Sequence, residues 1–183
     1  MIYPIVAYGD PVLRRKADEV QQGQIDLKKL SEDMFQTMYA AHGVGLACPQ
    51  IGLSLRMFVV DGKPMDDELE DFKKVFVNPQ MINESGEPWV FEEGCLSIPG
   101  IRDDVTRPSI IRLRYFDVEW NEHEEEFEDL RARIIQHEYD HIEGKLFTDY
   151  LSGFKKRILK GKLNSITRGK VDIDYKMRFP LKA

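Results

Sequence analysis

The sequence predicts an α+β fold in which mostly antiparallel strands surround a central helix that carries an HExxH metal motif, with a C-terminal helix and a tail strand. Three observations carry this prediction. Apolar residues recur at helical intervals near the N-terminus, short β-branched or aromatic runs fill the middle, and apolar and polar residues alternate strictly in the tail. At 183 residues with 42% hydrophobic content, the chain is expected to form one domain, 1–183.

The first expected element is a helix from about 24 to 41, because apolar residues lie three or four positions apart and His42-Gly43 follows as a stop. Turn pairs such as Asp61-Gly62 and Ser85-Gly86 separate the runs that follow. The expected strands are 56–60, 75–77, 89–91 and 110–115. We expect residues 121–126 to form a charged turn region and the acidic patch 122–128 to be a solvated turn.

A second helix is predicted from 129 to 143, with Gly144 suited to its C-terminal cap. A basic helix is expected from 151 to about 166. From Val171 to Phe179 every second residue is apolar, which predicts a half-buried strand.

The second helix contains His137 and His141, with Glu138 beside the first histidine. One helical turn separates the two imidazoles, so both can bind one metal ion while Glu138 reaches a water on that ion. Chance explains the pattern poorly, because the chain has only four histidines. The motif predicts hydrolytic metal chemistry.

The third ligand is expected upstream. Some HExxH peptidases place a histidine where this chain has Phe147, and no histidine follows His141. The upstream candidates are Cys48, Cys95, His42, His123, Glu92 and Glu93. Cys95 is favoured because the glycines and proline of 92–100 predict an irregular loop, and because one thiolate with two imidazoles leaves a fourth position for water. Taken alone, a cysteine is more often a small buried apolar residue.

Three separated segments together resemble the motifs of the peptide deformylases, enzymes that remove the formyl group from the starting methionine of new bacterial proteins. They are Gly43-Val44-Gly45-Leu46-Ala47-Cys48-Pro49-Gln50, Glu93-Gly94-Cys95-Leu96-Ser97 and Gln136-His137-Glu138-Tyr139-Asp140-His141. The resemblance covers about residues 1–150. Cys48 departs from it, since the family usually carries alanine there. Cys48 also argues against a dinucleotide-binding loop at 43–48, because it stands where that motif needs a small residue.

The resemblance implies a catalytic role for each motif. Cys95, His137 and His141 would hold the ion, and Glu138 would accept the proton of the attacking water and pass it to the departing amine. The Gln50 side-chain amide and the Leu96 backbone N–H would stabilise the charge on the formyl oxygen. We expect Gly45 to belong to the same catalytic group.

The resemblance also implies how the substrate binds. Backbone groups of Val44, Gly45 and Gly94 would pair with an extended peptide. The methionine pocket is assigned by position to Val44, Phe91, Leu130 and Ile134. Ordinary core packing explains any one of these residues equally well.

The metal and its surroundings follow the same resemblance. Glu93 and Arg107 would form an ion pair that stiffens the cysteine loop; two solvated charges are the alternative reading. One cysteine and two histidines can bind zinc, iron, nickel or cobalt. The resemblance favours Fe(II), with Zn, Ni or Co as substitutes.

Charge is distributed unevenly. The chain carries a net charge of −6, yet 155–170 holds only basic ionisable residues, namely Lys155, Lys156, Arg157, Lys160, Lys162, Arg168 and Lys170. A solvated helix face is the favoured explanation. The alternative is ribosome contact, since deformylases act on N-formylmethionyl peptides of nascent chains.

Other partners and surroundings are expected from composition. We expect a monomer that does not bind nucleic acid in a sequence-specific way. No membrane association is expected, because no apolar stretch approaches the ~20 residues of a membrane span. The start of the chain resembles no signal sequence and its two cysteines are too few for a disulfide scaffold, which favours the cytoplasm.

Two rival functions remain open from the residues. One is an HExxH peptidase that cuts internal amide bonds, against which the missing downstream ligand argues. The other is a non-catalytic peptide-binding module with a structural metal, against which Glu138 and Gln50 argue.

Overall fold

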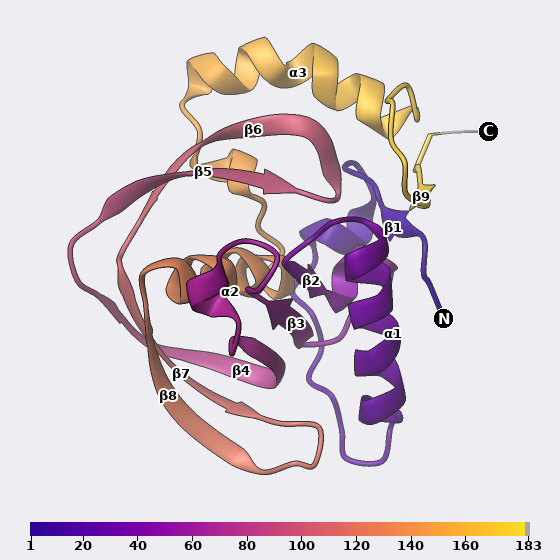
Figure 1. Ribbon diagram of the computed structural model, residues 1–183. Coiled ribbons are helices and arrows are strands. Elements are labelled where there is room, and N and C mark those ends of the chain that lie inside the picture. The colour runs from indigo at the N-terminus through magenta and orange to yellow at the C-terminus, as the bar shows by residue number, and fades with distance from the viewer. Residues whose placement is uncertain (182–183) are drawn as a thin grey trace.

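The computed structural model describes residues 1–181 and has the α+β architecture that the sequence predicts (Figure 1). The described residues form the helices α1 (Leu27–Ala40), α2 (Asp129–Ile142) and α3 (Gly153–Thr167), with short 3-10 turns η1 (Pro11–Arg14), η2 (Cys48–Ile51), η3 (Asp67–Leu69) and η4 (Phe147–Tyr150). The strands are β1 (Ile5–Val6), β2 (Gly45–Ala47), β3 (Met57–Asp61), β4 (Lys73–Ser85), β5 (Trp89–Cys95), β6 (Ile98–Arg107), β7 (Ile110–Phe116), β8 (Glu122–Glu128) and β9 (Met177–Arg178). None of the helices described has the length and hydropathy of a membrane span.

The strands surround α2. Five strands form the main sheet in the order β2-β3-β4-β7-β8, and all neighbours in it are antiparallel. Strands β5 and β6 form a separate antiparallel pair, and β1 pairs with β9 in parallel. Figure 1 shows α2 in the middle of the molecule, with the main sheet on one side and the β5-β6 pair arching over the other. The predicted arrangement of strands around a central metal-motif helix is confirmed.

Strand β3 shows how the core is divided. All five of its residues are buried, and successive side chains point to opposite faces of the sheet. Phe58 and Val60 pack in the apolar cluster that includes α2, whereas Met57 and Val59 pack in the cluster that includes α1. The main sheet is therefore covered by α2 on one face and α1 on the other.

The prediction of a charged turn at 121–128 is wrong, because residues 122–128 form β8. Its glutamates contact basic residues of β7, the neighbouring strand, and of β4, the next strand in the sheet. Arg112 and Arg114 of β7 contact Glu124 at 2.7 and 3.0 Å, and Lys74 of β4 contacts Glu125 at 3.0 Å. Such cross-strand ion pairs offset the low intrinsic strand preference of glutamate.

The irregular loop predicted at 92–100 is also wrong. Residues on both sides of a tight turn belong to strands, and Cys95 is the last residue of β5. The pairing register shifts between Gly94 and Cys95, so that Cys95 lies opposite Ile98. A shift of this kind re-aims the side chains at the strand end, here toward α2.

The predicted tail strand forms only in part. Burial alternates along 171–178 as expected, but regular pairing is limited to Met177 and Arg178, which lie opposite Ile5 and Val6. Because β1 is only two residues long, it offers no partner to the preceding tail residues.

Candidate metal centre

Helix α2 and the end of β5 bring the three predicted ligands together. His137 and His141 lie one turn apart, with ring centroids separated by 5.1 Å. The Cys95 Sγ atom lies 3.4 Å from His141 Nε2, and the ligand atoms of Cys95, His137 and His141 all lie within 4.8 Å of one another. Ligands of a tetrahedral site are separated by roughly 3.5 Å, so the three atoms fit a shared ion.

Backbone packing places the general-base candidate beside this cluster. A Cβ atom on Gly45 would collide with the side chain of Glu138. Strand β2 can therefore approach α2 closely only with glycine at this position. The segment around Gly45 thus forms one boundary of the space around the Glu138 carboxylate.

Glu138 is a buried carboxyl group with one unpaired oxygen in the part of the chain that the structure describes. Its side chain belongs to a residue that is 4% exposed, and its Oε2 atom has no hydrogen bond to any described residue. Burial raises the pKa of Glu138 to about 7, and the charges of Glu93 and Asp140 act in the same direction, whereas His137 opposes them. A carboxyl group with this pKa can both accept and release a proton near neutral pH.

The two histidines have different surroundings. His137 Nδ1 lies 3.0 Å from Glu93 Oε2, which fixes the ring and leaves its other nitrogen facing the cluster. Burial lowers the pKa of His137, but contacts with Cys95 and Glu93 outweigh burial and raise it. Burial and the charge of His137 lower the pKa of His141. His141 is therefore neutral, which is the form that binds metal.

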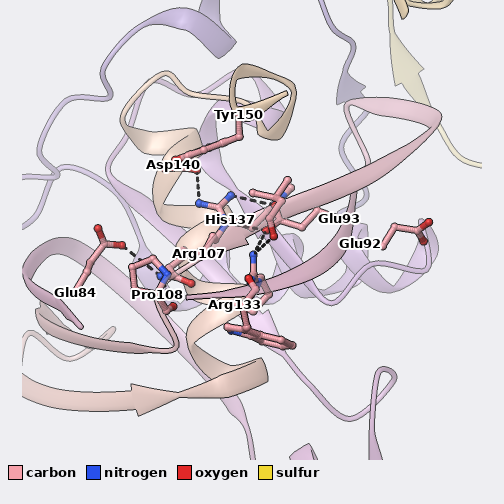
Figure 2. A network of polar contacts seen from close by, with 12 residues as sticks. Glu84, Glu92, Glu93, Arg107, Pro108, Arg133, His137, Asp140 and Tyr150 are labelled. Carbon is pink, nitrogen blue, oxygen red and sulfur yellow. Dashed lines mark hydrogen bonds and ion pairs between the residues drawn. The ribbon is translucent and has the colours of Figure 1, made fainter. Parts of the chain in front are cut away.

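Glu93 is the centre of a buried polar network (Figure 2). It accepts hydrogen bonds from Arg107 Nε at 2.7 Å, Arg107 Nη2 at 3.0 Å and Arg133 Nη1 at 3.0 Å. Burial alone would raise the pKa of Glu93, but His137 and Arg107 hold it well below its ordinary value. Glu93 and Arg107, which the sequence analysis paired, are 5% exposed each and are not two solvated charges.

The network extends to residues that the sequence analysis missed. Asp140 accepts hydrogen bonds from Arg107 Nη1 and the Tyr150 hydroxyl, both at 2.8 Å. Arg133 also donates to the carbonyl oxygens of Trp89 and Val105, at 2.7 and 3.0 Å. Helical spacing offered a signal for Arg133 and Asp140, since both lie one turn from a predicted ligand. The network ties the strand that carries Cys95 to the helix that carries the histidines.

Gln50 faces the cluster with a fixed orientation. Its Oε1 atom accepts a hydrogen bond from the Ala47 N–H at 2.9 Å. Its Nε2 atom is thereby turned toward Cys95 Sγ and Ser97 Oγ, at 3.6 and 3.3 Å. Gln50 is only 1% exposed, so little solvent competes for this amide. The arrangement points the N–H donors of the Gln50 side chain toward the side of the cluster where Cys95 lies.

A cavity of about 770 Å³ opens on the cluster. The predicted site residues that line it are Val44, Gly45, Gln50, Phe91, Glu93, Gly94, Cys95, Leu96, Ile134, His137 and Glu138. His141, Arg107 and Leu130 are not among its lining residues, and Leu130 packs against the apolar core. The lining also includes the tail residues Asp172 to Tyr175, which the sequence analysis assigned only to packing.

Comparison with known proteins agrees with this arrangement. Residues 2–157 match the family model described as polypeptide deformylase. A peptide deformylase of Cytophaga hutchinsonii is 58% identical over 183 residues, which is 100% of both chains. The chain belongs to the peptide deformylase family. A peptide deformylase of Christiangramia forsetii is 53% identical, covering 98% of this chain and 97% of its own. The crystal structure of a peptide deformylase from Legionella pneumophila has a TM-score of 0.82 and 40% identity, covering 93% of this chain and 98% of its own.

Family membership establishes the activity. Peptide deformylases are metal-dependent hydrolases that remove the N-formyl group from the N-terminal methionine of nascent proteins, and this chain has that function. The function predicted from the three motifs is confirmed. The internal-amide peptidase and the non-catalytic binding module are thereby set aside.

Proposed function

We propose that deformylation takes place at a single divalent ion held by Cys95, His137 and His141, with Glu138 as the group that moves the proton. The observation that supports this most strongly is the Glu138 carboxylate, which is buried without a hydrogen-bond partner for Oε2 in the described residues and lines the same cavity as Cys95. Such a group is costly to bury unless its environment is completed by a ligand or a water.

When bound, the ion supplies a Lewis acid and a water of lowered pKa. Glu138 accepts a proton from the attacking water as the new C–O bond forms at the formyl carbon. As the C–N bond breaks, Glu138 returns that proton to the methionine nitrogen, so formate and a free amino group leave. Its raised pKa suits both transfers.

Gln50 and Leu96 stabilise the charge that develops on the formyl oxygen. The donors are the Gln50 Nε2 group and the Leu96 backbone N–H, and loss of one such donor costs about 10²- to 10³-fold in rate. The hydrogen bond from the Ala47 N–H to Gln50 supports this role, because it keeps the amide from rotating. Gly45 serves the reaction by leaving room for the Glu138 carboxylate.

The peptide lies extended along the cavity, paired with backbone groups of Val44, Gly45 and Gly94. The apolar side chains of Val44, Phe91 and Ile134 form the methionine pocket, and all three line the cavity. Leu130 supports this pocket from the core side, where it packs next to the same apolar cluster as Val44 and Ile134. The cavity volume of about 770 Å³ leaves room for further residues of the peptide.

The ion in the cell is Fe(II), which the family resemblance favours. Zn, Ni or Co can substitute for it, since the donor set suits all four metals and affinity order alone does not decide occupancy. The test is metal analysis of anaerobically prepared protein, alongside its rate on an N-formylmethionyl peptide. We expect one ion per chain and loss of activity when a chelator removes it. Full activity without bound metal would refute the proposed site.

The chain works as one catalytic domain over 1–183, as a cytoplasmic monomer acting on nascent proteins. The single-domain assignment is supported by the tail, which lines the same cavity as the motifs. Contact with the ribosome runs through the basic face of α3. Phe154 and Ile158, one turn apart on that helix, are 70% and 62% exposed and add an apolar surface to it.

A further inference from the structure

The tail segment 172–175 lies in an unexpected place. It lines the cavity that contains Glu138 and the predicted ligands, although it follows residue 157, where the match to the family model ends. In Figure 1 the chain descends from α3 to β9, beside β1. Parallel pairing of Ile5 with Met177 fixes the tail just beyond the segment. The segment is therefore held at the cavity by contacts on its C-terminal side.

Two contacts attach this segment to facing parts of the cavity. The Tyr175 hydroxyl donates a hydrogen bond to the Leu96 carbonyl oxygen at 2.8 Å. Asp174 Oδ2 lies 3.4 Å from His42 Nε2. The side chains of His42 and Asp174 are 76% and 75% exposed, so this pair contributes little. The Tyr175 contact is the stronger one, because Tyr175 is half-buried and packs against the apolar cluster around α1.

The turn that Tyr175 contacts carries two groups of the reaction, the Cys95 thiolate and the Leu96 N–H. The Ser97 carbonyl oxygen in this turn accepts a hydrogen bond from the Tyr8 N–H at 2.8 Å. Gln50 Nε2 lies 3.3 Å from Ser97 Oγ on the cavity side. Among these contacts, that of Tyr175 acts on Leu96 itself and limits rotation of the Leu96–Ser97 peptide plane.

We propose that Tyr175 is a positioning residue for deformylation, and that 172–175 forms a further wall of the peptide cavity. By fixing the Leu96 carbonyl, the Tyr175 hydroxyl fixes the Leu96–Ser97 peptide plane and the position of the Leu96 Cα atom. It thereby restrains the preceding Cys95–Leu96 plane, whose N–H faces the formyl oxygen. This inference rests on the proposed role of the Leu96 N–H. Loss of one hydrogen bond of this kind is expected to reduce kcat by about 3- to 10-fold.

The test compares Tyr175→Phe with Tyr3→Phe, both in the full-length metal-loaded enzyme. Tyr3 is a matched control, since it is half-buried in the same apolar cluster but does not line the cavity. On an N-formylmethionyl tripeptide, we expect Tyr175→Phe to lower kcat with KM and metal content unchanged. We expect Tyr3→Phe to match the unmodified enzyme.

A second substrate separates positioning from a general loss of structure. An N-thioformyl peptide presents sulfur, a weaker hydrogen-bond acceptor than oxygen. The kcat loss of Tyr175→Phe should therefore be smaller on the thioformyl peptide. The rates on the formyl and thioformyl peptides are measured with the same protein preparation. Their ratio does not depend on the fraction of active protein, so the test remains valid for a variant that is partly unfolded.

Two results would overturn the inference. One is an unchanged kcat of Tyr175→Phe on the formyl peptide, and the other is an equal loss on both substrates, which would indicate a structural role only. Either result leaves the proposed reaction intact if the unmodified enzyme binds metal and is active. Failure of the unmodified enzyme in those respects would instead refute the proposed function, and this inference with it.

Discussion

Helices α2 and α3 are nearly equal in length, with 14 and 15 residues, yet they are buried to very different extents. Nine residues of α2 are buried, among them Arg133, Glu138 and Asp140, whereas only three residues of α3 are buried. The polar residues of α2 can be buried because most have partners on other elements, Glu93 and Arg107 above all. The charged residues of α3 face solvent. Partners elsewhere in the chain, rather than the composition of the helix, decide which polar residues enter the interior.

The difference predicts where substitutions act. A change in α2 or its partners should alter catalysis, metal binding or stability, because it leaves a buried group unpaired. A change on the outer face of α3 should leave catalysis, metal binding and stability unchanged. Such a change should alter only contacts with another molecule. Four variants, three single and one triple, test this contrast in order of decreasing effect.

Glu138→Gln should have the largest effect. The amide cannot accept the proton of the attacking water, so we expect kcat to fall by about 10²- to 10⁴-fold. Metal content should stay at the level of the unmodified enzyme, because Glu138 is not among the predicted ligands. Steady-state rates on a formylmethionyl peptide with metal analysis of the same preparation measure both. Near-normal turnover of this variant would exclude Glu138 as the proton carrier.

Cys95→Ser should weaken metal binding. Activity assays at saturating metal would underestimate this loss of affinity, because the excess metal fills the weakened site. Loss of a residue that hydrogen-bonds to a metal ligand typically lowers metal affinity by roughly 10- to 100-fold. Because Cys95→Ser replaces a predicted ligand itself, we expect a larger fall in metal affinity. Competition with a chelator measures this affinity. Cys48→Ala is the matched control, since Cys48 is fully buried beside Met34 and does not belong to the cluster of predicted ligands. Unchanged affinity in Cys95→Ser would remove this sulfur from the site.

Arg107→Ala should reduce stability. It leaves the buried carboxylates of Glu93 and Asp140 with fewer partners, at an expected cost of about 3 to 5 kcal/mol in the free energy of unfolding. Arg102→Ala is the control, because the pair of Arg102 and Glu92 is 60% exposed on both sides and is expected to contribute about 0 to 1 kcal/mol. Urea unfolding of both variants measures the difference. Equal stability of the two variants would contradict the structural role assigned to the Glu93 network.

Substitution of Arg157, Lys160 and Lys162 by glutamine should have the smallest effect on the isolated enzyme. No ion pair is found for these residues in the described part of the chain, so stability should change by about 0.5 kcal/mol or less for each. The rate on a short peptide should not change. Co-sedimentation with ribosomes should weaken in the variant and fall with added salt in the unmodified enzyme. Salt-independent or absent co-sedimentation would argue against ribosome contact through α3.

The sequence predicted the features that depend on local spacing. Helix α1 follows from apolar periodicity within one segment, and the strands β3 and β7 follow from β-branched or aromatic runs. The convergence of His137 and His141 also follows from helix geometry alone. For Cys95, the choice among six upstream candidates rested on thiolate chemistry and on an irregular loop that does not form, and the family resemblance implied the same residue.

The sequence did not predict features that depend on distant partners. Strand β8 forms because Arg112 and Arg114 lie opposite its glutamates, a register that no local pattern encodes. Burial of Arg133 depends on Glu93, 40 residues earlier in the chain. The tail reaches the cavity because β1, at the other end of the chain, pairs with β9. In each case the stabilising contact joins residues that are far apart in the sequence and come together only in the folded chain.

Strand β8 occupies the outer edge of the main sheet (Figure 1). One side of an edge strand presents backbone N–H and C=O groups that could recruit a strand from a second molecule. A row of glutamates along that margin makes such recruitment repulsive, because two copies brought edge to edge would oppose like charges. We therefore expect the acidic character of this strand to disfavour edge-to-edge association of two copies, which is a demand on the chain separate from its chemistry.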